Sequence, residues 1–185
     1  TGWFVMQLKS SRIAGLRVDN AGFQGATNFL NSVTNKEGVS GYTRGEGYSP
    51  AMTSVAMVCR QFMGTPNNDP VLQKAATYLD QYTPTWQMGQ QRLRGRDSGF
   101  YYWYYGTLCM FQMGGAHWKK WNTGMKKTML ENQRKGGPMD GSLNDVDGSW
   151  DPQSWIDKYG GRVFTTALGA LTLEVYYRYL PMYAK

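Results

Sequence analysis

A recurrence of about fifty residues constrains the fold of this chain more than any other feature of its sequence. Segments typical of buried helices end at Gly15, Gly64 and Gly114, and these glycines lie 49 and 50 residues apart. A glycine just past a helix end adopts the left-handed conformation that closes the last turn, so three in register mark three equivalent helix ends. The sequence therefore predicts a stack of similar helix pairs.

Each unit also contains a predicted partner helix, and these cover residues 21–33, 69–82 and 116–133. Their equivalent apolar residues keep the same interval: Leu30, Leu79 and Met129. The second partner has the clearest start, because Asn68 or Asp69 can cap it and Pro70 suits a first helical turn. A last helix is predicted from about Arg162 to Leu180, after a loop rich in Gly, Asp and Pro over 135–160.

One helix of each pair carries few charges: 53–63, 100–114 and 163–179. Helices that are apolar nearly all round are buried, whereas the lysine-bearing partners face solvent. This predicts an all-α fold with about seven main helices, in which an inner row packs against an outer row. We interpret the arrangement as a partial ring, an alpha/alpha-toroid-like stack that forms one domain over residues 1–185.

The formal charge of +7 is spread along the chain and forms no dense basic run. Lys126, Lys127, Arg134 and Lys135 come nearest to a patch, and we interpret them as a solvated helix face whose cations complement the helix dipole. We therefore predict no nucleic-acid partner. The apolar runs are also too short for a membrane span, so no transmembrane segment is expected, and the compartment is left open.

Several local motifs resemble the prenyltransferase and squalene oxidase repeat family, the alpha/alpha-toroid group of squalene-hopene cyclases, protein prenyltransferase beta subunits and complement-like thioester domains. Gln133 followed by Asp147-Gly148-Ser149-Trp150 is similar to the family's Gln-to-Gly-x-Trp signature, and 100–115 and 161–173 resemble its inner helices. The resemblance implies that the glutamine and the loop indole tie one helix pair to the next. Because the family's ring has about six pairs, it also implies a C-terminal part of a longer chain, or an open arc covered by a partner or a second copy.

The cyclase resemblance makes Asp145 and Asp147 candidate catalytic acids. Cyclases of this group protonate an alkene with an aspartic acid held over a dry aromatic cavity, and two neighbouring carboxylates can raise each other's pKa. The alternative interpretation is structural, since Asp147 also belongs to the Asp-Gly-Ser-Trp turn, where a carboxylate caps backbone amides.

Candidate ligand-binding residues come from the aromatic run and from polar residues on the predicted inner helices: Tyr101, Tyr102, Trp103, Tyr105, Gln112 and Arg162. Aromatic faces can hold an apolar ligand or stabilise a carbocation. Consecutive residues point in every direction round a helix, however, so two or three rings at most can face one cavity. Core packing is the alternative for the rings, and hydrogen bonding within a buried layer is the alternative for the polar residues.

No metal site or cofactor is predicted. His117 is the single histidine and has no carboxylate and cysteine at a zinc-binding spacing. Cys109 and Gln112 have the spacing of a thioester but not its intervening residues. Cys59 and Cys109 hold equivalent places in two inner helices, so we expect buried free thiols.

These observations favour a non-catalytic helical-repeat module for ligand or protein binding, since each catalytic signature of the family is absent or broken. The alternative is a terpenoid-cyclase-like or prenyltransferase-like enzyme domain that acts on a polyprenyl or triterpene substrate. The corresponding partners are an apolar or isoprenoid ligand, or a protein that completes the ring.

Overall fold

The computed structural model describes residues 1–86, 99–136 and 146–178. Every regular element in these ranges is a helix, and seven of them are main helices. The only ladder pairings recorded there are the isolated bridges Thr34–Ser40 and Thr43–Glu46. The all-α prediction is thus confirmed. Within the same ranges, none of the helices has the length and apolarity needed to cross a membrane.

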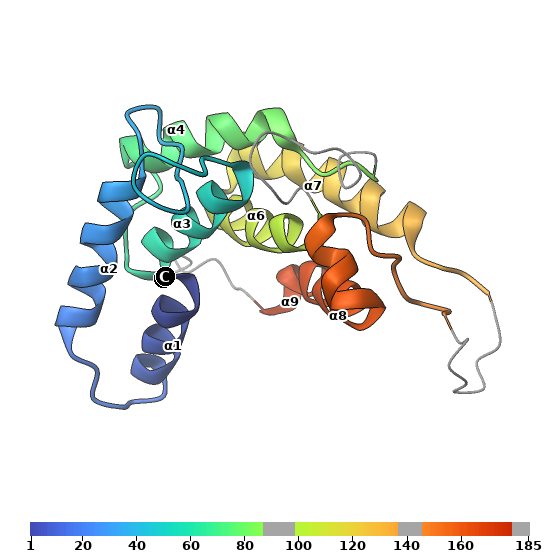
Figure 1. The fold of residues 1–185 in the computed structure, drawn as a ribbon, viewed down its shortest axis with the longest axis horizontal. Coiled ribbons are helices and arrows are strands. Elements are labelled where there is room, and N and C mark those ends of the chain that lie inside the picture. Colours follow the sequence, from blue (N-terminus) through green and yellow to red (C-terminus); the bar gives the residue numbers. More distant parts are fainter. Residues whose placement is uncertain (87–98, 137–145, 179–185) are drawn as a thin grey trace.

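Four helices form a continuous inner row, in which each helix contacts the next. They are α1 (Gly2–Ile13), α3 (Pro50–Phe62), α6 (Phe100–Met113) and α8 (Trp155–Leu173). Figure 1 shows this row bent into an open arc, with α1 at one end and α8 at the other. The two short elements are η1 (Asp80–Tyr82) and α9 (Val175–Arg178).

An outer row covers the convex side of the arc (Figure 1). Its helices are α2 (Asn20–Val33), α4 (Pro70–Leu79) and α7 (Gly115–Asn132). Each contacts the inner helix that precedes it in the chain, so the pairs are α1 with α2, α3 with α4, and α6 with α7. The inner and outer rows therefore follow the predicted alternation along the chain.

The predicted glycines do close helices. Gly15 and Gly64 have φ values of 77° and 94°. After each, the next amide donates to a carbonyl five residues earlier, from Leu16 to Ser11 and from Thr65 to Arg60, as in a Schellman motif. Gly114, with φ 67°, instead joins α6 directly to α7.

The helix starts follow side-chain caps. Ser49 and Asp69 accept hydrogen bonds from backbone amides of the first turns of α3 and α4, and a proline occupies the first turn in both cases. Asp69, rather than Asn68, is the cap of α4. A side-chain oxygen at this position satisfies an amide that has no partner inside the helix.

The core centres on α6, which packs against α3, α7 and α8. Gly106 allows α6 to pack closely against α7: a Cβ atom at this position would lie 2.3 Å from the indole of Trp121 on α7. That indole donates to the Thr107 hydroxyl at 2.9 Å and is fully buried. The glycine thus allows a whole tryptophan side chain to be removed from water.

The last helix differs from its prediction. It begins at Trp155 rather than near Arg162, so 155–160 is helical and not part of the loop. A reciprocal capping box between Ser154 and Asp157 explains the early start. Gly161, with φ 70°, then interrupts the helix, and a second segment continues to Leu173.

Candidate functional site

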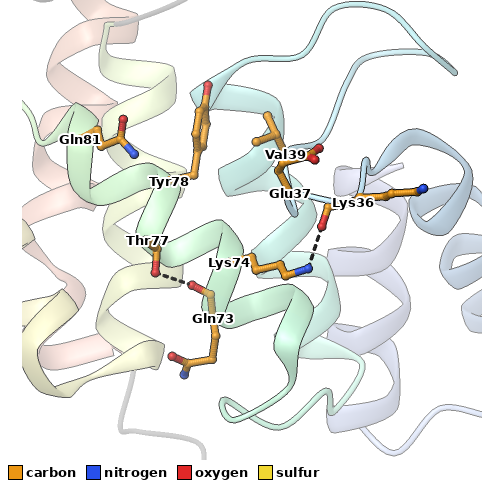
Figure 2. Close-up of a pocket in the computed structure, with 8 residues that line it drawn as sticks. All are labelled: Lys36, Glu37, Val39, Gln73, Lys74, Thr77, Tyr78 and Gln81. Atoms are coloured by element: carbon orange, nitrogen blue, oxygen red, sulfur yellow. Dashed lines mark hydrogen bonds between the residues drawn. The ribbon is translucent and has the colours of Figure 1, made fainter.

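A groove lies on the outer surface of the described part of the chain, between α4 and the loop after α2 (Figure 2). Its volume is about 640 Å³, within the usual range for small-ligand sites. The lining residues are Lys36, Glu37, Val39, Gln73, Lys74, Thr77, Tyr78 and Gln81.

The loop wall of the groove is held by side-chain and backbone contacts. The Asn35 carboxamide oxygen accepts hydrogen bonds from the amides of Glu37, at 3.1 Å, and Val39, at 2.9 Å. Gly38 has φ 78°, and a Cβ atom there would lie 2.9 Å from Cβ of Lys74. A glycine is therefore needed for the loop to approach α4 this closely.

The helix wall of the groove carries side chains with polar ends and one aromatic ring. Gln73, Thr77 and Gln81 follow one another at helical spacing along α4 and its 3₁₀ extension. The Lys74 ammonium donates to the Lys36 carbonyl at 2.8 Å across the groove (Figure 2). Burial, followed by the neighbouring Tyr82, raises the pKa of Tyr78 to about 12, so this phenol stays neutral. Such a wall can hydrogen-bond a polar ligand and pack against one ring.

The predicted aromatic residues do not line this groove. Tyr102, Trp103 and Tyr105 are buried, at 1% exposure or less, and Tyr101 is partly exposed. Tyr102 packs edge-on against Trp121 and donates to the Tyr82 carbonyl at 2.9 Å.

The rings also point to different neighbours. Trp103 packs against Phe100 with the rings tilted and their centroids 4.9 Å apart, and the Tyr105 hydroxyl donates to the Met6 sulfur at 3.9 Å. Burial is the first cause of the raised pKa values of Tyr102 and Tyr105. These contacts fit the core-packing alternative.

Gln112 and Arg162 do not line the outer groove either. Gln112 is 6% exposed near the end of α6, and its side-chain oxygen has no hydrogen-bond partner in the described ranges. Arg162 donates to the Ser149 hydroxyl at 3.0 Å and pairs with Asp151 at 2.5 Å. Burial raises the pKa of Asp151, but hydrogen bonds from Arg134 and Arg162 outweigh it, so the net pKa is lowered.

Asp147 lies in a turn and Asp145 lies outside the described residues. The Asp147 carboxylate accepts a hydrogen bond from the Gly136 amide at 2.6 Å. The Gln133 side chain donates to the Gly148 carbonyl at 2.8 Å, and the Trp150 indole donates to the Met129 carbonyl at 2.9 Å. The glutamine and the indole therefore hold this loop against the end of α7. Trp150 also packs closely on Gly169 of α8.

The two cysteines are free and buried, as predicted. Burial raises the pKa of Cys59 to about 11, and it also raises the pKa of Cys109. Both groups are therefore poor thiolate nucleophiles near neutral pH. The described ranges contain no group of three or more His, Cys, Asp or Glu residues that could hold a metal ion.

Two polar contacts were not foreseen. His117 Nδ1 lies 2.8 Å from Asp80 Oδ2, which joins α7 to η1. Because these residues are 37 positions apart, no local spacing signals the pair. Asp157 is fully buried, and one of its oxygens accepts from the amides of Ser154, at 2.9 Å, and Phe100, at 3.3 Å. The Ser-x-x-Asp spacing of a capping box is a signal that could have found it.

Large apolar side chains are exposed at both ends of the inner row. On α8, Trp155 is 66% exposed and Tyr159 85%, with ring centroids 5.7 Å apart. On α1, Trp3 is 62% exposed, Phe4 71% and Ile13 76%. In the interior of the row, α3 and α6 are covered by neighbours on both sides. No family model, curated protein or solved structure matches this chain.

Proposed function

We propose that this chain is a non-catalytic helical-repeat module that binds protein, and that its first partner is a second copy of itself. The observation that carries this proposal is the exposure of aromatic and aliphatic side chains on α1 and α8, the two ends of the inner row. Contiguous exposed apolar side chains mark interaction surfaces in folded proteins.

The row itself suggests how two copies would meet. Each inner helix packs on the next, from α1 to α3, then α6, then α8. Continuing that order would bring α8 of one copy against α1 of another. Such a contact uses two different surfaces, so it is head-to-tail and each copy keeps one unused end.

The resemblance to the prenyltransferase and squalene oxidase repeat family is compatible with this proposal. Members of that family complete a ring of helix pairs, and the second copy would here extend the open arc. The alternative of a cyclase-like or prenyltransferase-like enzyme lacks a supporting observation: Asp147 is held by a backbone amide, and the Tyr101 to Tyr105 run is packed among other side chains.

Sedimentation equilibrium of two end variants tests the proposal. Phe4→Glu places a charge on the α1 face, and Tyr159→Glu places one on the α8 face. The wild type should self-associate within about 1 to 100 µM, whereas each variant alone should remain monomeric. A mixture of the two variants should form a dimer and nothing larger, because one intact α8 face then meets one intact α1 face.

Tyr42→Glu is the matched control, since Tyr42 is 74% exposed but lies in the loop before α3. It should associate like the wild type, and circular dichroism should show all three variants folded. A wild type that stays monomeric throughout this range would contradict the proposal. An end variant that still dimerises alone would contradict the head-to-tail arrangement.

A further inference from the structure

The outward face of α7 carries four exposed lysines: Lys119, Lys120, Lys126 and Lys127. Lys119 and Lys126 are seven residues apart, as are Lys120 and Lys127. Seven residues make about two helical turns, so the lysines form two parallel lanes on one face. Figure 1 shows α7 in the outer row, on the convex side of the arc.

These lysines are not neutralised. The ion pairs in the described part of the chain join His117 to Asp80 and join Asp151 to Arg134 and Arg162, so none involves the four lysines. Glu131 is the only acidic residue within α7. It follows Lys127 by four residues, and this order of charges is the less favourable one for a helix.

Stabilisation of the helix itself does not account for the two lanes of lysines either. The sequence predicted that cations here complement the helix dipole, but the last turn of α7 contains no basic residue. Lys119 and Lys120 lie in the second turn, toward the positive end of the dipole, where a cation gains nothing from it. Among the described residues, the four charges therefore add repulsion without an ion-pair partner.

The other residues on the lysine face of α7 indicate what this face binds. The Thr123 hydroxyl lies there and already donates to the Lys119 carbonyl at 2.9 Å. Leu130 is 50% exposed on the same face, about one turn beyond Lys126 and Lys127. An exposed leucine next to lysines suits the boundary between lipid headgroups and acyl chains. Reading a nucleic acid would instead require free donors or acceptors between the lanes, and a phosphate fork would favour arginine over lysine.

From this arrangement we infer that α7 is a docking surface for an anionic lipid bilayer. The lysine lanes provide the attraction to the headgroups, and Leu130 enters the interface. Binding is peripheral, reversible and dependent on ionic strength, because it rests on a few charges and one apolar side chain. It involves neither the end faces of the inner row nor the outer groove.

Vesicle co-sedimentation of the full chain tests the inference. Vesicles with about 30% phosphatidylserine in phosphatidylcholine should retain the wild type at about 0.1 M salt, and pure phosphatidylcholine vesicles should not. Replacing all four lysines by glutamine should lower the partition coefficient about 1000-fold. Leu130→Gln should lower it by a further few-fold with no change in net charge.

The charge-matched control replaces four exposed cations elsewhere, Arg17, Lys36, Arg44 and Lys158, by glutamine. It has the same net charge as the lysine variant but should bind vesicles like the wild type. Equal losses in both quadruple variants would overturn the inference, since binding would then depend on total charge alone. Wild-type binding to a DNA duplex but not to phosphatidylserine vesicles would also overturn it.

Discussion

The helices in the middle of the inner row are much more buried than the helices at its ends, although large apolar side chains occur in both. Eleven of the fourteen residues of α6 are buried, and ten of the thirteen residues of α3. At the ends, α8 buries four of nineteen residues and α1 buries one of twelve. Yet both end helices carry large apolar side chains, so the apolar pattern alone does not place a helix inside the fold. Burial requires a packed inner helix on each side, and among the four described inner helices this holds for α3 and α6.

The same comparison explains where a substitution should affect folding and where it should affect association. In the middle of the row, a lost side chain leaves a cavity, because interiors are close-packed. At the ends, the side chain already contacts water, and its loss changes only what the surface can bind.

Tryptophan truncation offers the largest contrast. Trp121→Ala should lower the free energy of unfolding by about 3–5 kcal/mol, because Trp121 is fully buried against Gly106 and bonded to Thr107. Trp155→Ala removes the same atoms from a side chain that is 66% exposed, and should change it by less than about 0.5 kcal/mol. Urea unfolding followed by circular dichroism, at a concentration where the chain is monomeric, measures both. Comparable losses would mean that α8 is covered after all.

The anchor between α6 and α8 gives the next effect. Asp157→Ala leaves the amides of Ser154 and Phe100 without their shared acceptor, and should cost about 2–4 kcal/mol. Asp157→Asn keeps an acceptor oxygen and should cost less. Asp19→Ala is the control, because Asp19 is an exposed cap that accepts from one amide, and its loss should cost about 1 kcal/mol. If Asp157→Ala costs no more than this control, α8 is not held through its N-terminus.

Replacing a glycine by alanine should have opposite effects on stability in the inner row and in the outer row. Gly106→Ala places a Cβ atom 2.3 Å from the Trp121 ring, and should destabilise the fold by about 1–3 kcal/mol. Gly25→Ala, on α2, meets nothing within 4 Å and should stabilise it by about 0.4–1 kcal/mol. Thermal unfolding of both variants gives the sign directly. A stabilising Gly106→Ala would show that α7 can move away from α6.

Sequence periodicity predicted the regular part of this fold. Gly15, Gly64 and Gly114 close helices because a positive φ favours glycine wherever it occurs. The prediction failed at the start of α8, where the Gly, Asp and Pro content of 135–160 suggested a loop but the capping box at Ser154 begins a helix at Trp155. Local signals thus identify helix ends, and competing local signals need the tertiary structure to decide between them.

The candidate sites were less predictable, for a reason of geometry. The run from Tyr101 to Tyr105 shows aromatic character but not which neighbour each ring meets. The outer groove is lined by residues as far apart in the sequence as Lys36 and Gln81, and the Asp80–His117 contact links two helix pairs. Such juxtapositions depend on how the pairs stack, and a single sequence gives no distance between residues that lie far apart along the chain.

The smallest predicted effect is the loss of folding stability at alkaline pH, which tests how well the interior of the stack is shielded from water. Burial raises the pKa of Cys59 from 9.0 to about 11 and that of Tyr78 from 10.0 to about 12. Between these values the folded chain keeps protons that the unfolded chain has lost, so its stability must fall as pH rises above about 9. Urea unfolding across this range should show the decline, and Cys59→Ala should make it shallower between about pH 9 and 11. A thiol reagent should correspondingly modify the unfolded chain much faster than the native one at pH 8. Equal slopes for Cys59→Ala and the wild type would indicate that water reaches the cluster in which Cys59 packs with Val5 of α1 and Leu30 of α2. The burial of α3 that sets the middle of the row apart from its ends would then be lost.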